Sequence, residues 1–239
     1  MKLSVLMPVF NERPWIETVV AKALIQRVPG ITETEVVIVD DGSTDGTREI
    51  IIRLAKKYPS QLNAIFHQKN AGKGAAIQTA IDKMTGDVCI IQDADLEYDP
   101  AEYPLMLEPI IQGRADCVYG SRFVGTQAKR VLYFWHFVAN QGITLISNMF
   151  TNLNLSDIET GYKAFRCSIL KTIPIRSKGF SLEPEITMKI AQRKCRVYEV
   201  GISYQGRTYQ EGKKITPMDG FKAVLTILKF WVWNDAYRK

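Results

Sequence analysis

Two aspartates separated by one residue, Asp93 and Asp95, follow the apolar run of residues 88–91. Side chains alternate along an extended chain, so the two carboxylates share a face if the strand continues through them. Carboxylate oxygens are ligands that Mg²⁺ and Mn²⁺ prefer, and a cation held there can bridge the oxygens of a diphosphate. The alternative is a solvated acidic turn, since Asp is a common turn residue. The pair alone does not decide between the two.

A second acidic motif, Asp40-Asp41-Gly42-Ser43-Thr44-Asp45-Gly46, also follows an apolar run. A carboxylate there can accept hydrogen bonds from a nucleobase or a ribose, whereas the same residues also suit a turn and a helix N-cap. The acidic pocket of a response regulator is a rival interpretation, but it needs the acidic pair after the first strand. Here the pair follows the second predicted strand, which argues against that interpretation.

A third motif, Asn70-Ala71-Gly72-Lys73-Gly74, combines glycines with a lysine that opens a predicted helix. Glycines allow a close backbone approach, and a helix N-terminus favours an anion, so the motif is typical of a phosphate-binding turn. The G-x-x-x-x-G-K-[ST] spacing of a P-loop is absent, which leaves that assignment unsupported. A helix N-terminus with an exposed lysine is the alternative.

Strand-like and helix-like segments alternate through the first half of the chain. The predicted strands cover residues 3–10, 35–40, 64–67, 88–93 and 117–120, and the predicted helices cover residues 15–25, 45–57, 74–84 and 102–112. This order predicts an α/β fold with a Rossmann-like, mostly parallel central sheet flanked by helices. Because ligands bind beyond the carboxyl ends of such strands, we expect the polar motifs to converge on one cleft.

The alternation is lost after Arg122. Residues 131–156 contain no Asp, Glu, Lys or Arg, which suggests a membrane span, but their scattered Asn, Gln and His side chains are costly in lipid. We therefore predict amphipathic helices at about 131–155. These would belong to a catalytic domain over residues 1–215, followed by a C-terminal amphipathic helix within 216–239. A helix over 184–193, a strand over 197–204 and a polar loop over 207–214 are also predicted.

Composition narrows the class of protein. A chain of 239 residues with 46% hydrophobic and 23% charged residues is typical of a globular protein. The net charge of +6 suits a phosphorylated substrate, an anionic membrane surface or nucleic acid. Nucleic acid is the least favoured, because no Lys- and Arg-dense tract and no aromatic stacking platform is present.

Four cysteines, namely Cys89, Cys117, Cys167 and Cys195, show no C-x-x-C spacing and are predicted to be free thiols in a reducing compartment. The apolar residues 1–10 are too short for a signal peptide core and lack a cleavage site. Both features predict a cytoplasmic location.

The order and spacing of the motifs across residues 3–100 resemble family 2 glycosyltransferases of the GT-A fold. The fourth of these motifs is Pro8-Val9-Phe10-Asn11-Glu12. The resemblance implies a nucleotide-sugar donor, inversion at the anomeric carbon, and Mg²⁺ or Mn²⁺ at Asp93 and Asp95. The nucleotide-sugar residues that it implies are Pro8, Val9, Asn11, Glu12, Asp40, Asp41, Gly42, Lys73, Asp93, Ala94, Asp95, Arg207, Lys213 and Lys214.

The second half resembles polyprenyl-phosphate glycosyltransferases of the dolichol-phosphate mannose synthase type. The matching segments are Ser121-Arg122-Phe123, the stretch from Asp157 to Arg166, and the basic loop 207–214. The resemblance implies transfer of a hexose from a donor such as GDP-mannose or UDP-glucose to dolichyl or undecaprenyl phosphate. The implied catalytic residues are Asp95, Asp157, Arg122 and Arg207.

The same resemblance gives these residues roles. Arg122 and Arg130 would hold the acceptor phosphate, and Arg207 with Lys213 or Lys214 would close over the donor diphosphate. Asp157 would orient a substrate or act as a base. A merely solvated side chain is the alternative for Arg130 and Arg207.

Aromatic residues suggest which segments of the chain would contact a membrane. Trp231 and Trp233 lie beside Lys229, and the segment Tyr133-Phe134-Trp135 lies close to Arg130. This pattern suits a peripheral anchor on the cytoplasmic face of a membrane, and packing on the protein's own core or on a second subunit is the alternative.

Two other functions stay open at this point. One is a family 2 enzyme with a soluble sugar, polysaccharide or glycerolipid acceptor. The other is a noncatalytic sugar-nucleotide-binding or membrane-scaffold protein, against which the acidic pair and the basic loop argue. The donor sugar, the choice of metal and the oligomeric state do not follow from the sequence.

Overall fold

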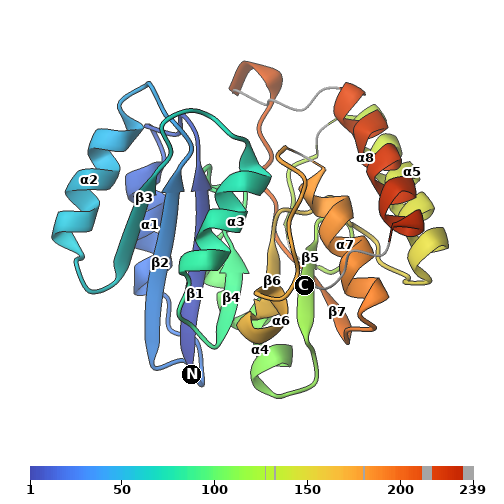
Figure 1. The fold of residues 1–239 in the computed structure, drawn as a ribbon, viewed down its shortest axis with the longest axis horizontal. Coiled ribbons are helices and arrows are strands. Elements are labelled where there is room, and N and C mark those ends of the chain that lie inside the picture. Colours follow the sequence, from blue (N-terminus) through green and yellow to red (C-terminus); the bar gives the residue numbers. More distant parts are fainter. Residues whose placement is uncertain (127, 132, 180, 212–216, 234–239) are drawn as a thin grey trace.

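The computed structural model describes residues 1–126, 128–131, 133–179, 181–211 and 217–233. A seven-stranded sheet in the order β3-β2-β1-β4-β6-β5-β7 forms its centre (Figure 1). The strands are β1 (Lys2–Val9), β2 (Glu33–Asp40), β3 (Leu62–Phe66), β4 (Val88–Ile91), β5 (Cys117–Ser121), β6 (Lys163–Arg166) and β7 (Val197–Gly201). The helices are α1 (Ile16–Ile25), α2 (Thr47–Lys57), α3 (Lys73–Lys83), α4 (Tyr103–Ile111), α5 (Phe134–Thr151), α6 (Cys167–Leu170), α7 (Leu182–Gln192) and α8 (Pro217–Val232), with short 3₁₀ turns η1 (Pro100–Glu102) and η2 (Tyr209–Glu211).

Strands β1 to β4 pair in parallel, as the alternating sequence pattern predicts, and β7 is parallel to β5. Strand β6 was not predicted, and it runs antiparallel between β4 and β5. Because of this direction, the segment that precedes β6 lies beside the carboxyl ends of β4 and β5. The other strands run in the same direction as one another, and β6 runs in the opposite direction. Residues 157–162 therefore lie at the same edge of the sheet as the acidic motifs.

The sheet separates two hydrophobic cores. Strand β2 is apolar on both faces, because Val36 and Ile38 pack into one core while Val37 and Val39 pack into the other. Helices α1, α2 and α4 contribute to the first core, and α3, α6 and α7 contribute to the second. A strand buried on both faces is typical of a parallel sheet covered by helices, so the predicted α/β class is confirmed.

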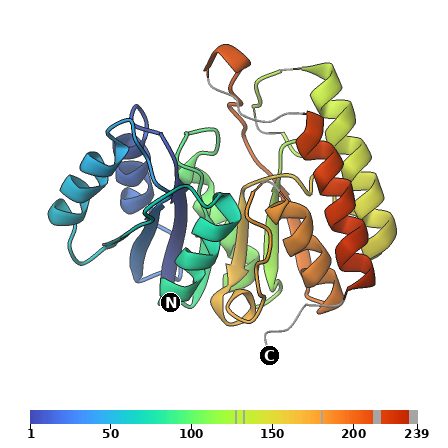
Figure 2. The same cartoon turned by 45° about the horizontal axis from the view of Figure 1, so that its top comes forward.

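Helices α5 and α8 lie side by side on one flank of the molecule, outside α7 (Figures 1 and 2). Ile227 and Phe230 of α8 are buried, whereas Phe221 and Trp231 on the same helix are exposed. Both segments are therefore amphipathic helices, as predicted. Within the described ranges, no helix combines the length and the apolarity that crossing a bilayer requires.

All four cysteines are free thiols, as predicted. Cys89, Cys117 and Cys167 are buried in the second core, and Cys195 is half-buried beside it.

Candidate active site

The loops after β1 and β2 are bonded to each other. The backbone N–H of Asn11 donates to Ser43 Oγ at 2.9 Å, and Asn11 Oδ1 accepts from the N–H of Thr44 at 2.9 Å. Asn11 has a φ of 56°, in the left-handed region that Asn tolerates better than most residues. Asn11 therefore fixes its own motif, Pro8 to Glu12, against the second motif, Asp40 to Gly46.

Asp41 joins the second motif to the third. Asp41 Oδ1 accepts from the N–H of Ala71 at 2.9 Å, Asp41 Oδ2 accepts from the N–H of Gly72 at 2.7 Å, and His67 Nδ1 lies 2.7 Å from Asp41 Oδ1. At Gly42, where φ is 78°, a Cβ would lie 2.8 Å from the backbone of Asn70. The three predicted motifs are thus held together by direct contacts between their loops.

Asp40 and Asp41 of the second motif are both occupied by protein partners. Asp40 has no exposed surface and accepts from Arg48 Nε at 2.7 Å. Asp41 is 3% exposed and holds the turn before α3. The geometry gives these two carboxylates a role in shaping the loops, and direct contact with a nucleoside stays a prediction for the motif.

Three other predicted nucleotide-sugar residues are partly or fully buried. Val9 and Ala94 are buried in the first core, while Pro8 is half-buried at the end of β1.

Lys73 opens α3 and faces the acidic pair. Lys73 Nζ lies 3.0 Å from Asp93 Oδ1 and 3.1 Å from Glu183 Oε1. Burial alone would lower the pKa of Lys73, but the charges of Asp93 and Glu183 outweigh it and hold that pKa well above its ordinary value. Lys73 is therefore a fixed cation beside Asp93 and not the exposed lysine of the alternative interpretation.

Asp93 and Asp95 come together through a turn. Strand β4 ends at Ile91, two residues before the predicted end at Asp93, so the extended chain that would place both carboxylates on one strand face is not formed. The side-chain amide of Gln92 donates to the carbonyl oxygens of Asp93 and Tyr98, and this closes the turn in place of strand pairing. Burial, together with the charges of Asp93 and Glu97, raises the pKa of Asp95 to about 7.

Arg207 is the second cation of the site. Its Nη2 lies 2.5 Å from Asp95 Oδ2, its Nη1 lies 3.2 Å from Glu12 Oε2, and its backbone N–H donates to Glu97 Oε1 at 2.8 Å. One guanidinium thus joins the ends of β1 and β4 to the loop after β7. The predicted partners Lys213 and Lys214 lie outside the described residues.

The donor set fits a divalent cation that is shared with a substrate. Asp93 and Asp95 offer hard oxygen ligands, and the raised pKa of Asp95 reflects its burial and the neighbouring negative charges of Asp93 and Glu97, which Arg207 only partly offsets. No cluster of three or more metal-ligating side chains occurs among the residues described. Mg²⁺ is commonly bound by one or two carboxylates plus substrate phosphates, so two carboxylates match that arrangement.

Arg122 and Asp157 form a buried ion pair. Arg122 Nε donates to Asp157 Oδ2 at 2.6 Å and Arg122 Nη2 donates to Asp157 Oδ1 at 2.7 Å, and the Asp157 side chain has no exposed surface. The guanidinium also lies 5.2 Å from the ring centroid of Tyr204. Because both of its oxygens face Arg122, Asp157 is placed to orient that arginine, and its roles toward a substrate stay predictions.

Arg130 is held differently. Its Nη1 donates to Glu211 Oε2 at 2.8 Å and to the carbonyl of Gly206 at 3.1 Å, and its backbone N–H donates to the carbonyl of Tyr204. Tyr204 is therefore a neighbour of both predicted acceptor arginines. The Arg130 side chain stays 44% exposed, so it is accessible to an anionic group.

Five residues of the site were not predicted from the sequence. They are Glu97, Tyr98, Glu159, Lys163 and Glu183. Glu97 continues the alternation of acids after Asp93 and Asp95, which was an available signal. Tyr98 follows Glu97 in the loop after β4, and the other three are brought in by β6, by the segment before it and by α7.

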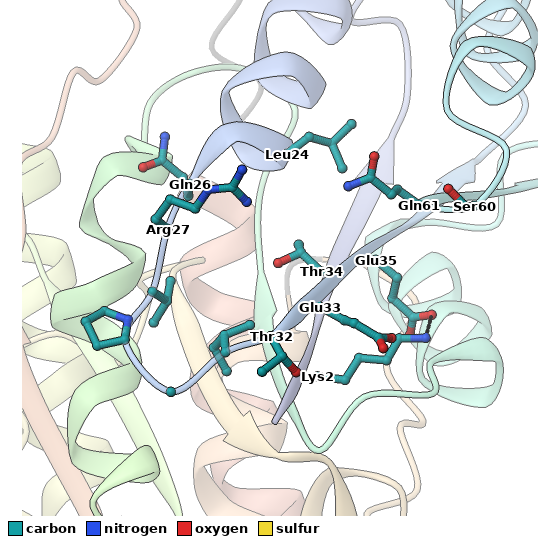
Figure 3. Close-up of a pocket in the computed structure, with 14 residues that line it drawn as sticks. Lys2, Leu24, Gln26, Arg27, Thr32, Glu33, Thr34, Glu35, Ser60 and Gln61 are labelled. Carbon is teal, nitrogen blue, oxygen red and sulfur yellow. Dashed lines mark ion pairs between the residues drawn. The ribbon is translucent and has the colours of Figure 1, made fainter.

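A hollow of about 670 Å³ lies elsewhere, at the amino ends of β1 and β2 (Figure 3). Figure 3 shows Lys2, Glu33 and Glu35 at this place, with Lys2 paired to Glu35 at 3.0 Å. Ligands of parallel sheets bind at the opposite ends of the strands, where the acidic motifs converge. The hollow is therefore not the candidate active site.

Known proteins resemble this chain in sequence. A dolichol-phosphate mannosyltransferase of Pyrococcus furiosus is 29% identical over 90% of this chain, which spans 61% of that protein's length. A UDP-N-acetylglucosamine–dolichyl-phosphate N-acetylglucosaminyltransferase of Methanococcus voltae is 26% identical over 95% of this chain and 94% of its own length.

The fold matches as well. The crystal structure of glucosyl-3-phosphoglycerate synthase from Mycobacterium tuberculosis, in complex with Mn²⁺, UDP and glucosyl-3-phosphoglycerate, has a TM-score of 0.70 and 19% identity over 95% of this chain and 79% of that chain. The sequence model of glycosyl transferase family 2 matches residues 4–173. Since that match covers most of the chain and agrees with its fold, the chain belongs to glycosyl transferase family 2.

Proposed function

We propose that the chain transfers a hexose from a nucleotide sugar to a polyprenyl phosphate in a metal-dependent, inverting reaction. The observation that carries this proposal is the placement of Asp93 and Asp95 between two cations, Lys73 and Arg207, at the carboxyl ends of the strands. A diphosphate needs neutralising charge as it leaves, and this site offers it from both sides.

On the donor side, Asp93 and Asp95 would hold the metal together with the diphosphate. A bound Mg²⁺ or Mn²⁺ would supply electrostatic stabilisation of the leaving nucleoside diphosphate. Lys73 and Arg207 lie close enough to these carboxylates to contact the same phosphates. The Asn11 and Asp41 contacts hold the loops that would enclose the nucleoside.

On the acceptor side, two arguments support a polyprenyl phosphate. The two relatives described above differ in the sugar that their names give, and both names contain a dolichyl phosphate. Arg122 and Arg130 both lie beside Tyr204, where they could bind an acceptor phosphate. A phosphate oxygen is already anionic, so it can attack the anomeric carbon in line with the leaving group without a strong general base.

The reaction can be tested with purified protein, Mg²⁺ or Mn²⁺, a panel of UDP- and GDP-sugars, and a short polyprenyl phosphate. We expect one donor to give metal-dependent nucleoside diphosphate release together with a lipid-linked sugar. Release without a lipid product would contradict the acceptor and point to a soluble sugar, polysaccharide or glycerolipid. If no donor in the panel gave nucleoside diphosphate release, that result would contradict catalysis and favour a noncatalytic sugar-nucleotide-binding protein.

Arg207→Gln should lower turnover about 100-fold while strengthening the binding of Mn²⁺ to the nucleotide-free protein. The first effect follows from the loss of a cation at the diphosphate. The second follows because Arg207 Nη2 competes with the metal for Asp95 Oδ2. Initial rates and a Mn²⁺ titration followed by electron paramagnetic resonance measure the two effects.

The matched control is Arg53→Gln, an exposed arginine on α2, which should change neither quantity. If Arg207→Gln weakened Mn²⁺ binding in the absence of nucleotide, the placement of the metal at Asp95 would be wrong.

We also propose that the outer face of α5 and α8 binds the cytoplasmic surface of a membrane that carries the acceptor. Both helices expose large apolar side chains there. These are Phe134, Trp135, Leu145, Met149, Phe221, Leu225, Trp231 and Val232. Two basic residues of α8, Lys222 and Lys229, are exposed on the same helix, which suits an anionic lipid surface.

The double variant Phe221→Ser with Trp231→Ser should bind anionic vesicles at least about 10-fold more weakly, because it removes two apolar side chains from the lipid interface. Co-sedimentation with vesicles of phosphatidylcholine and phosphatidylglycerol at low salt measures the loss. Ile25→Ser is the control, since Ile25 is 67% exposed at the end of α1, away from this face. Equal loss in the control, or no vesicle binding by the unaltered protein, would contradict the proposal.

A further inference from the structure

Glu183, in the first turn of α7, is an acid that the proposed reaction has not used. The residue is 5% exposed, and its Oε1 lies 3.1 Å from Lys73 Nζ. Its other oxygen, Oε2, is buried without a hydrogen-bond partner among the described residues. Since buried polar atoms are almost always paired in folded proteins, an orphan acceptor beside a substrate site calls for a donor from outside the chain.

Glu159 has the same property and lies in the same charged cluster. Its Oε1 is buried and has no partner in the described part of the chain, although the residue as a whole is partly exposed. Burial and the charge of Glu183 raise the pKa of Glu159 to about 8, so the two acids are electrostatic neighbours.

The segment that carries Glu159 is held in place. Lys163 Nζ donates to the carbonyl of Ile158 at 2.9 Å and also to the carbonyl of Thr160. The next residue, Gly161, passes so close to the site that a Cβ there would lie 2.5 Å from Asp93 Oδ2. The backbone is therefore anchored on both sides of Glu159, and it passes beside Asp93 two residues further on.

The chemistry of the two oxygens selects their ligand. Both oxygens can accept from an O–H group, and a neutral ligand rich in hydroxyls would satisfy them without the repulsion that a phosphate would meet at Glu183. Glu183 is joined to Asp93 by a single shared ammonium, that of Lys73. The sugar of a nucleotide sugar is attached directly to the diphosphate, so a diphosphate at Asp93 brings the sugar to this cluster.

We infer that Glu183 and Glu159 accept hydrogen bonds from hydroxyl groups of the transferred sugar and thereby select the donor. This inference rests on the proposed function, because it assumes a nucleotide sugar at Asp93 and Asp95. Lys73 is 19% exposed and pairs with Asp93, so a diphosphate bound there would attract its ammonium away from Glu183. The carboxylate of Glu183 then becomes available to the sugar.

The test is a binding experiment with Glu183→Gln in the presence of Mn²⁺. Isothermal titration with UDP, UDP-glucose, GDP and GDP-mannose first finds the nucleotide sugar that the unaltered protein binds. Glu183→Gln should bind that nucleotide sugar at least about 10-fold more weakly and its nucleoside diphosphate within about twofold of the unaltered protein. If Glu183 only positions Lys73, Glu183→Gln should lose affinity equally for the nucleotide sugar and for the nucleoside diphosphate. That result would overturn the inference.

Monodeoxy analogues of the same donor give a second readout. The analogue that lacks the contacted hydroxyl should bind the unaltered protein weakly and should lose nothing further in Glu183→Gln. Glu159→Gln should show the same pattern with the same or a neighbouring hydroxyl. If every analogue lost affinity equally in Glu183→Gln, neither oxygen would be reading a hydroxyl and the inference would be wrong.

Glu185→Gln is the matched control on the same helix. Glu185 is fully buried and its Oε1 lies 2.5 Å from Lys189 Nζ, so this variant should lower stability and leave the preference for the sugar unchanged. Because binding needs no acceptor, the experiment separates the two proposals. A hydroxyl-dependent loss without a lipid product would support the inference and contradict the acceptor, while absence of any nucleotide binding would overturn both.

Discussion

Asp95→Asn should lower turnover at least about 1,000-fold while leaving the fold intact. The carboxylate that would share the metal with the diphosphate is lost. Folding should survive because Asp95 is crowded by the charges of Asp93 and Glu97, and Arg207 keeps its contacts with Glu97 and Glu12. Initial rates of lipid-linked sugar formation and thermal unfolding without metal measure the two effects.

Asp82→Asn is the matched control, because Asp82 is exposed near the C-terminal end of α3, at the opposite end of that helix from Lys73. It should retain full turnover. The unaltered protein in excess chelator should resemble Asp95→Asn in activity. Turnover above a tenth of normal in Asp95→Asn, or normal turnover in chelator, would contradict a metal-dependent transfer at this site.

Breaking the buried pair between Arg122 and Asp157 should have the largest effect on stability. Arg122→Gln or Asp157→Asn alone should each lower the free energy of unfolding by about 3–5 kcal/mol, because each leaves a buried charge without its partner. The double variant should lose clearly less than the sum of the single variants. Urea unfolding of all four proteins completes the cycle, and strictly additive losses would contradict the coupling.

Turnover in the same variants separates the roles of Asp157. At a temperature where Asp157→Asn is still folded, an orienting residue predicts a raised KM for the lipid phosphate with a smaller change in kcat. A general base predicts a large loss of kcat at saturating acceptor. Near-normal turnover of Asp157→Asn would remove the base role altogether.

The sequence predicts the sheet because its strands are long apolar runs that alternate with amphipathic helices. It also places the acidic motifs at the strand ends, although Asp93 and Asp95 lie in a turn and not on one face of an extended strand. The chain turns after Ile91, and the amide of Gln92 supplies the contacts that close the turn. A side-chain contact of this kind has no periodic signature in the sequence.

Strand β6 and the two unpartnered acids show what a single sequence does not reveal. Residues 163–166 are too few to show an alternation, and their pairing with β4 and β5 depends on residues far away in the chain. The local sequence around Glu159 and Glu183 does not distinguish them from ordinary surface acids. Their burial depends on how α7 and the segment before β6 pack around Lys73, which only the tertiary structure shows.

The most direct test of the central claim is a crystal structure of the protein with Mn²⁺ and the nucleoside diphosphate that it binds. The anomalous signal of Mn²⁺ locates the metal without any assumption about the ligand. We predict a peak that is shared by the carboxylates of Asp93 and Asp95 and the diphosphate, with Lys73 or Arg207 on the phosphates. A metal and diphosphate bound elsewhere, for example in the hollow beside Lys2 and Glu35, would contradict the site and the function built on it.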